Sequence, residues 1–303
     1  MNKDVERIKH MMNDDGFDAI EFENILSHYQ DTPALVPYRL PKGSKIIRSS
    51  TNEANRFHEN VSRLNYPPIE YARTDRASRK GKPMFYGSIF TSAYKNNALP
   101  RIFSALETTD ILRDFEKTGK VFTTQSLWLP SRDLQLFSFP FAKTYKKPCK
   151  ELKEQRLIWK TKLRNFWSED YCQFAEYLGV LMAETNHSCL YEITSRSIEH
   201  ILYRSRVSDT LDGVIYPSVW GNGQGMNICL KKETVDECIH FQAASVQCID
   251  KYVGQSNIFG VAESVLQSNG KLRWIPTELA LHILDDAYGI DELIKKGTII
   301  VEK

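Results

Sequence analysis

The segment GVIYPSVWGNGQG, residues 213–225, decides how the fold is interpreted. An apolar, β-branched run with the composition of a strand stops at Pro217, and three glycines then follow at every second position from Gly221. Such a segment can be a loop that binds phosphate, a hairpin turn that needs glycine, or a platform that presents Ser218 to a ligand.

The spacing of the glycines favours a turn. The pattern G-x-G-x-G differs from the dinucleotide-binding G-x-G-x-x-G, which also requires a helix directly after the glycines. Here the sequence continues as MNICLKK, residues 226–232, which is short, apolar and typical of a strand. We therefore predict two strands joined by a hairpin in which the glycines adopt positive φ angles.

The rest of the chain predicts strands and helices in irregular order. The first 30 residues favour one or two amphipathic helices, and the proline-rich residues 31–43 predict an extended connector. Strands are expected over 44–50, 84–90, 120–129, 134–141, 239–250 and 258–267, and helices over 99–115, 168–184, 197–206 and 276–296. This order lacks regular βαβ alternation, so the predicted class is α+β rather than a doubly wound sheet, with one domain.

Composition excludes several classes of protein. The net charge of +2 gives no overall field for nucleic acid or an anionic membrane. The charged N-terminus lacks the pattern of a signal peptide, and no run approaches the roughly 18 apolar residues of a membrane span. We expect a cytoplasmic protein whose six scattered cysteines are reduced core thiols. His187, Cys189 and His200 lack the tight spacing of a zinc site, so no metal is expected.

Residues 143–164 form the most basic segment of the chain. On a helix, Leu152, Leu157 and Leu163 would alternate with lysines and arginines. The favoured interpretation is a solvated helix with one apolar stripe, and the alternative is a patch that binds nucleic acid or an acidic partner.

Three motifs in order resemble the RES-domain family, which is named for its Arg, Glu and Ser residues. GVIYPSV, with the turn and the Asn-bearing strand that follow, resembles the third signature of that family. RASRKGKPMFY, from Arg76 to Tyr86, is similar to the first, and FSALE, which ends at Glu107, is the candidate for the second. The resemblance covers residues 45–250 as a core, with an N-terminal helical arm over 1–44 and a strand and helix extension over 251–303.

The resemblance implies a fold and an activity. The family's mixed sheet resembles that of ADP-ribosyltransferases, and members include toxins that consume NAD as a substrate, with no further cofactor. A helix-turn-helix antitoxin is the partner it implies, and self-association stays open. The acceptor of ADP-ribose is also open: water would make the protein an NAD glycohydrolase, and a protein acceptor would make it an ADP-ribosyltransferase. A non-catalytic module that binds through residues 143–164 is the alternative of another class.

The residues that carry the resemblance suit this chemistry. Nicotinamide leaves NAD without needing a proton, so the enzyme must stabilise a cationic ribosyl centre, and a carboxylate such as Glu107 can do so. Arg76 offers a planar fork of donors to the pyrophosphate, and Tyr86 a flat face to the nicotinamide ring. Each residue also has a purely structural interpretation: a solvated helix residue, an arginine of a basic loop and a half-buried strand residue, respectively.

Three further residues are expected to contact the substrate. Ser218, held by Pro217, is positioned to bind the nicotinamide ribose or carboxamide at the wall of the pocket. Arg48 in the strand IIRSS is typical of the strand-borne arginine of ADP-ribosyltransferase folds, and Tyr216 lies in the serine motif. The glycines of the turn are expected to keep side chains out of the pocket.

Overall fold

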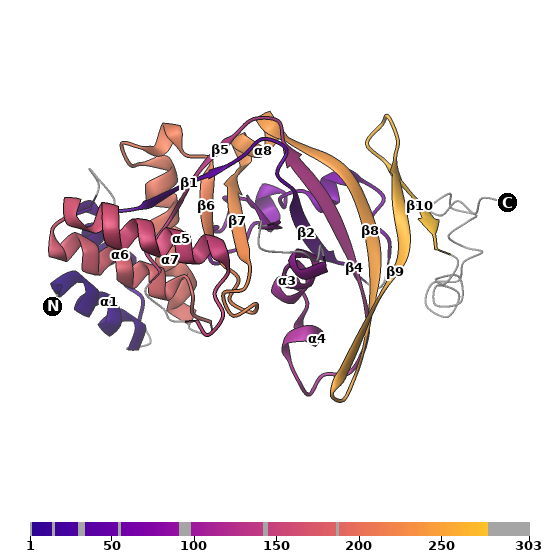
Figure 1. Ribbon diagram of the computed structural model, residues 1–303, viewed down its shortest axis with the longest axis horizontal. Helices are drawn as coiled ribbons and strands as arrows, with labels where there is room; N and C mark the ends of the chain where they lie inside the picture. The colour runs from indigo at the N-terminus through magenta and orange to yellow at the C-terminus, as the bar shows by residue number, and fades with distance from the viewer. Residues whose placement is uncertain are drawn as a thin grey trace.

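The protein is built on one ten-stranded sheet with helices packed against it (Figure 1). The computed structural model describes residues 2–13, 16–29, 34–53, 56–90, 98–141, 145–185 and 188–277. The strand order is β1-β5-β6-β7-β3-β2-β4-β8-β9-β10, and every neighbouring pair is antiparallel except β5 and β6. The strands are β1 Val36–Leu40, β2 Ile46–Thr51, β3 Met84–Ile89, β4 Gly119–Pro130, β5 Leu134–Ser138, β6 Gly213–Pro217, β7 Met226–Lys231, β8 Ile239–Tyr252, β9 Gln255–Leu266 and β10 Leu272–Pro276.

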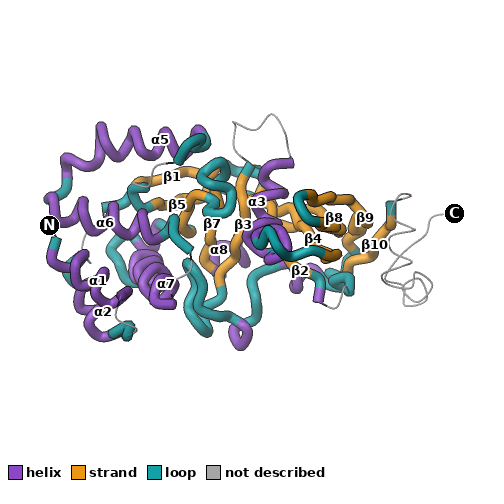
Figure 2. Tube along the Cα trace, turned by 90° about the horizontal axis from the view of Figure 1, so that it is seen from below, coloured by secondary structure: helices purple, strands orange, loops and turns teal. Residues whose placement is uncertain are grey.

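The helices divide into two groups. One group packs around the β1-β5-β6-β7 end of the sheet, and α3 and α4 lie beside β2 and β4, as Figures 1 and 2 show. The bounds are α1 Lys3–Asn13, α2 Ala19–Ser27, α3 Ala98–Thr108, α4 Asp110–Arg113, α5 Lys150–Ile158, α6 Glu169–Leu181, α7 Ser188–Tyr203 and α8 Lys232–Cys238. Short 3-10 turns cover Val61–Leu64, Ile69–Tyr71, Arg164–Phe166 and Ser208–Thr210, and a π-helical turn covers Trp159–Leu163.

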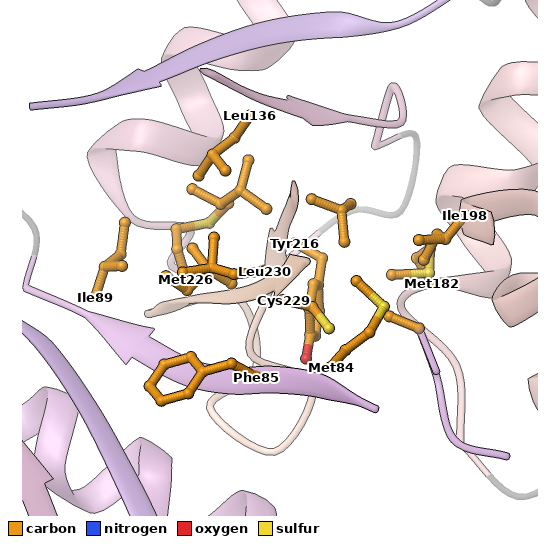
Figure 3. Close-up of a cluster of buried hydrophobic side chains, with 14 of the residues drawn as sticks. Met84, Phe85, Ile89, Leu136, Met182, Ile198, Tyr216, Met226, Cys229 and Leu230 are labelled. Carbon is orange, nitrogen blue, oxygen red and sulfur yellow. The ribbon is translucent and has the colours of Figure 1, made fainter. Parts of the chain in front are cut away.

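The main core joins the sheet to the first group of helices. Figure 3 shows Met84, Phe85, Tyr216 and Cys229, from β3, β6 and β7, in one cluster of buried side chains. Helix α1 adds to the same core through residues at helical spacing such as Ile8, which is fully buried. Helices α1 and α2 thus pack into the core, and β1 belongs to the sheet.

The α+β class predicted from the sequence is confirmed, and the sheet is mixed, as the resemblance implied. The hairpin over residues 213–225 is also confirmed, because β6 and β7 pair in antiparallel register from Gly213 with Leu230 to Pro217 with Met226. The expectation that the glycines adopt positive φ angles holds for Gly223, at 72°, and is wrong for Gly221 and Gly225; the other residue of the turn with a positive φ is Asn222, at 49°.

Two expected segments were wrong in type or length. Residues 31–43 were expected to form a connector, but β1 lies within them and pairs with β5. Its Pro37 is tolerated because β1 is the edge of the sheet, where a missing N–H breaks no ladder. The helix expected over 197–206 begins earlier, at Ser188. Almost all of the helix expected over 276–296 lies outside the described residues. His187 also lies outside them.

Other expectations from composition can be compared with the structure. All six cysteines are buried thiols, as expected for a reduced core. No helix in the described part of the chain is long and apolar enough to cross a membrane. Among the same residues, no group of three or more His, Cys, Asp or Glu side chains could hold a metal ion.

The basic segment 143–164 uses several of its cations within the chain. Arg164 forms ion pairs with Glu169 and Glu176, Arg156 donates to the carbonyl of Phe141, and Lys150 pairs with Glu154. Of the expected apolar stripe, Leu152 is buried and Leu157 is exposed. These contacts support the interpretation of a surface helix.

Candidate functional site

Residues of α3 and of the strands β2, β3, β6 and β7 line a cavity of about 550 Å³. This volume lies within the range of small-molecule sites, about 300–1,000 Å³. Five of the six residues singled out in the sequence line it: Arg48, Arg76, Tyr86, Glu107 and Tyr216. They come from segments up to 168 positions apart, so the fold brings together most of the residues that the motifs indicated.

Glu107 lies near the end of α3 and is held by two donors. The Ser218 hydroxyl donates to its Oε1 at 2.8 Å, and the Asn227 side-chain amide donates to the same oxygen at 3.0 Å. Within the described part of the chain, no donor contacts Oε2. The carboxylate is therefore fixed through one oxygen, which leaves the other for a ligand in the cavity.

Ser218 lies behind Glu107, and the expectation that it forms the wall of the cavity needs correction. Its side chain is 0% exposed, and it does not line the cavity. While its hydroxyl donates to Glu107, its oxygen accepts the backbone N–H of Gly221 at 3.0 Å. Because the hydroxyl has only one proton, this arrangement commits it to the carboxylate. Ser218 thus positions Glu107.

Asn227 also positions Glu107, and the sequence alone did not single it out as a site residue. It is the polar residue of the apolar strand β7, and it pairs in register with Ser88 of β3 and Tyr216 of β6. The Ser88 hydroxyl lies 2.7 Å from the Asn227 side-chain oxygen in a buried contact. This contact orients the amide so that its NH₂ group faces Glu107. A single polar side chain in a buried strand was the available signal.

The glycine turn holds the helix that carries Glu107. A Cβ atom at Gly225 would lie 2.4 Å from the Phe103 ring, and one at Gly221 would lie 2.8 Å from the same ring. Phe103 and Glu107 are four residues apart on α3 and therefore share one face of that helix. Gly221 and Gly225 make room for this ring. None of the three turn glycines lines the cavity, which corrects the expectation that they keep side chains out of it.

Arg76 lines the cavity, but its guanidinium is committed in part to the protein. Its Nη1 donates to the carbonyls of Met182, at 2.7 Å, and Glu184, at 3.0 Å, which follow the end of α6. The guanidinium carbon also lies 5.5 Å from the centre of the Tyr191 ring. Arg76 is 5% exposed, although Arg73 and Lys80 of the same loop are exposed, so Arg76 itself is not a solvated arginine of a basic loop. Arg76 joins this loop to α6 and α7.

Tyr86 anchors the same loop from β3. Its hydroxyl accepts the backbone N–H of Ala77 at 3.0 Å and donates to the Ser78 hydroxyl at 3.1 Å. Burial is the main cause that raises the pKa of Tyr86 well above its ordinary value, so the phenol stays neutral. Since the hydroxyl is used for the loop, the ring is the part of Tyr86 that is left for a ligand.

Glu199 of α7 binds the C-terminal end of the loop that contains Arg76 through two ion pairs. It pairs with Arg79 at 2.7 Å and with Lys82. Burial opposes its ionisation, but the hydrogen bonds from Lys82 and Arg79 outweigh burial, and the pKa of Glu199 lies below its ordinary value.

Arg48 supplies positive charge to the cavity. Its Nη1 donates to the Tyr86 carbonyl at 3.0 Å, and its guanidinium lies 5.5 Å from the centre of the Phe85 ring. Burial lowers the pKa of Arg48, although a guanidinium stays charged at neutral pH. In the described part of the chain, no carboxylate forms an ion pair with it. An anionic ligand group would offset that charge.

Positive charge and aromatic rings dominate the lining of the cavity. Four arginines line it against two carboxylates, Asp75 and Glu107. The arginines are Arg48, Arg73, Arg76 and Arg113, and the aromatic residues are Tyr71, Tyr86, Tyr191, Tyr216 and Trp220. Such a lining favours an anionic ligand with flat rings.

Trp220 and Arg113 were not identified from the sequence. The Arg113 guanidinium lies 5.3 Å from the centre of the Trp220 ring, so this pair brings together α4 and the turn after β6. Their contact depends on tertiary structure, and neither residue belongs to one of the motifs.

No protein-family model matches the chain, and no curated protein matches its sequence. The assignment of this site therefore rests on its geometry and chemistry.

Proposed function

We propose that this protein is an NAD-consuming enzyme that cleaves the bond between nicotinamide and ribose. The observation that carries the proposal is the Glu107 carboxylate, which two donors hold through Oε1 at a cavity with an excess of arginines. A carboxylate so fixed can act on a cationic centre, and the arginines can bind an anion.

The proposed reaction needs little acid–base chemistry. Nicotinamide departs as a neutral base when the electrons of the C–N bond move to its ring nitrogen. The ribosyl carbon becomes electron-poor, as in glycoside hydrolysis, and Glu107 Oε2 stabilises this charge or orients the attacking water. When water adds, it loses a proton to solvent and leaves ADP-ribose.

The arginines and rings would bind the remainder of the substrate. The pyrophosphate carries the negative charge that Arg48 and the neighbouring arginines can offset. The ring of Tyr86, with its hydroxyl committed to the Arg76 loop, can contact the nicotinamide. In this proposal, Ser218 and Asn227 act as positioning residues.

The resemblance to RES-domain proteins extends the proposal. We assign the sheet to the ADP-ribosyltransferase-like type and the protein to the family of NAD-degrading toxins in the cytoplasm. A helix-turn-helix antitoxin would then be the partner that restrains it. The order Arg76, Tyr86, Glu107, Ser218 supports this assignment, because the fold gathers these four residues around one cavity or directly behind it.

Product analysis tests the proposal and identifies the acceptor. Purified protein is incubated with NAD labelled in the adenylate half, and free ADP-ribose is separated from labelled macromolecules. We expect free ADP-ribose and nicotinamide in equal amounts, and a loss of both with Glu107→Gln. Glu263→Gln, an exposed residue of β9, is the matched control and should keep the activity. Label transferred to a protein would instead assign transferase activity to the same site, and intact NAD would refute the proposal.

A further inference from the structure

A second hollow adjoins the cavity that contains Glu107. It has a volume of about 680 Å³, and four residues line both spaces: Arg48, Pro67, Tyr71 and Arg73. The two spaces therefore meet at a wall that carries two arginines.

The side chains change in character from one space to the other. Glu107 and the aromatic residues Tyr86 and Tyr216 line the first space alone. Arg48 and Arg73 line the shared wall. The two arginines that line the first space alone have partners within the chain, because Arg76 donates to two backbone carbonyls and Arg113 pairs with Asp110. The order along the two spaces is thus a carboxylate with aromatic rings, then cations, then the second hollow.

The second hollow has little net charge of its own. Its ionised pair, Arg63 and Glu53, lies 3.7 Å apart, and the remaining lining is mainly neutral and polar or made of proline and tyrosine. His58 also lines it, and burial lowers the pKa of this histidine, which keeps the imidazole neutral at neutral pH. A neutral group with a flat ring and several hydrogen-bonding atoms suits such a surface.

From this order we infer that the second hollow binds the adenosine half of NAD, with the pyrophosphate at Arg48 and Arg73. This inference rests on the proposed function and deepens it. Along NAD, nicotinamide riboside is followed by pyrophosphate and then by adenosine. The lining follows the same order, from Glu107 in the first space to Arg48 and Arg73 at the shared wall and then to the second hollow. The enzyme is therefore selective for a dinucleotide over nicotinamide mononucleotide, which contains the same scissile bond but lacks the adenosine half.

Tyr71 is the residue at the shared wall best placed to stack on the adenine or on the adjoining ribose. Its side chain is 65% exposed and it lines both spaces. It follows Pro67 and Pro68 in a short 3-10 turn, which limits the freedom of the backbone that carries the ring. Stacking of a base on an aromatic side chain contributes enough to change affinity by about tenfold.

Binding of ADP tests the inference without relying on turnover. Ser62 is exposed and lines only the second hollow, so Ser62→Trp should fill that space without disturbing the core. Ser256→Trp, at an exposed position of β9, is the matched control. By titration calorimetry with ADP, we expect Ser62→Trp and Tyr71→Ala each to weaken binding by about tenfold or more, and the control to bind like the wild type. Equal affinity in all four proteins would overturn the inference.

Selectivity between two substrates separates this inference from the proposed function. We expect kcat/KM for NAD to exceed that for nicotinamide mononucleotide by about 100-fold, and Ser62→Trp to reduce that ratio by about tenfold. If both substrates are cleaved equally well, the second hollow has no part in binding and the inference fails, while the proposed function stands. If ADP binds in the predicted manner but neither substrate is cleaved, the adenosine site stands and the proposed function fails.

Discussion

Gly225→Ala tests whether the glycine turn positions the candidate catalytic helix. A Cβ at residue 225 would lie 2.4 Å from Phe103 Cδ2, 2.8 Å from Cε2 and 3.2 Å from Cγ. Carbon atoms in contact are normally about 3.5–4.0 Å apart, so the turn and the ring must separate by about 1 Å. Both residues are buried, and overpacking of this kind costs about 1–3 kcal/mol. We expect the free energy of unfolding to fall by about that amount.

The same displacement should reach Glu107. Phe103 lies one helical turn before Glu107 on α3, so a movement of the ring shifts the carboxylate relative to Ser218 and Asn227. A misplacement of about 1 Å at a catalytic group can reduce the rate by about 100-fold. We therefore expect NAD turnover by Gly225→Ala to fall more than its stability alone explains, at a temperature where the variant is folded.

A second glycine substitution serves as the control, and a smaller side chain at residue 103 serves as the rescue. Gly260→Ala places a methyl group 3.9 Å from its nearest neighbours, the side-chain amide atoms of Gln247, so the stability and turnover of this variant should match the wild type. Adding Phe103→Leu to Gly225→Ala removes the clash, and the two changes together should cost less than the sum of their separate costs. Stability is measured by urea denaturation. The reasoning is refuted if Gly225→Ala is as stable and active as Gly260→Ala. It is also refuted if the stability costs of Gly225→Ala and Phe103→Leu simply add in the double variant.

Three further predictions concern the side chains around the cavity. Asn227→Leu removes a hydrogen bond to a charged group, worth about 1.5–3 kcal/mol, and should lower kcat for NAD by about 10- to 100-fold in a steady-state assay. Arg76→Leu leaves two carbonyls near the end of α6 without their donor and should lower the free energy of unfolding by about 2–4 kcal/mol; a thermal midpoint equal to the wild type would contradict this anchoring role. The pKa of Glu199 is depressed in the folded state, because this carboxylate forms ion pairs with Lys82 and Arg79. These ion pairs therefore stabilise the protein fully at pH values above 4.5, the ordinary pKa of glutamate, and this contribution is lost as the pH falls through the lower pKa of the folded state. Urea midpoints at pH 7 and below pH 4 should therefore differ less in Glu199→Gln than in the wild type, and an equal difference would count against this ion pair.

The hairpin over 213–225 could be predicted because its signal is local. The spacing of the glycines and the strand pattern on both sides exclude a nucleotide-binding turn without any knowledge of tertiary structure. The reason for two of the glycines could not be predicted. Gly221 and Gly225 are needed because Phe103, more than 110 residues earlier, packs against them.

The site residues show the same division between local and tertiary signals. The motifs indicated Arg76, Tyr86 and Glu107, and the fold places all three at one cavity. Their contacts could not be inferred, because the partners of Arg76 are backbone carbonyls near the end of α6, which carry no sequence signal. Ser218 follows Pro217 in the sequence as a turn residue would, and only the position of α3 determines that its hydroxyl meets Glu107.

The strand β1 was missed for a related reason. Prolines at 33, 37 and 41 indicate an extended connector, and the backbone is indeed extended over Val36–Leu40. Whether an extended segment joins a sheet depends on the edge available to it. Here β5 offers that edge, and a proline on an outermost strand costs no hydrogen bond in the ladder.

The central claim is that Glu107 stabilises a ribosyl cation formed from NAD. The most direct measurement is the rate of nicotinamide release from NAD by the wild type and by Glu107→Gln, with ADP binding and the thermal midpoint recorded for both proteins. The account predicts release by the wild type and a rate at least about 100-fold lower in the variant, with ADP affinity and thermal midpoint nearly unchanged. Equal rates in the two proteins, or no release by the folded wild type, would contradict it.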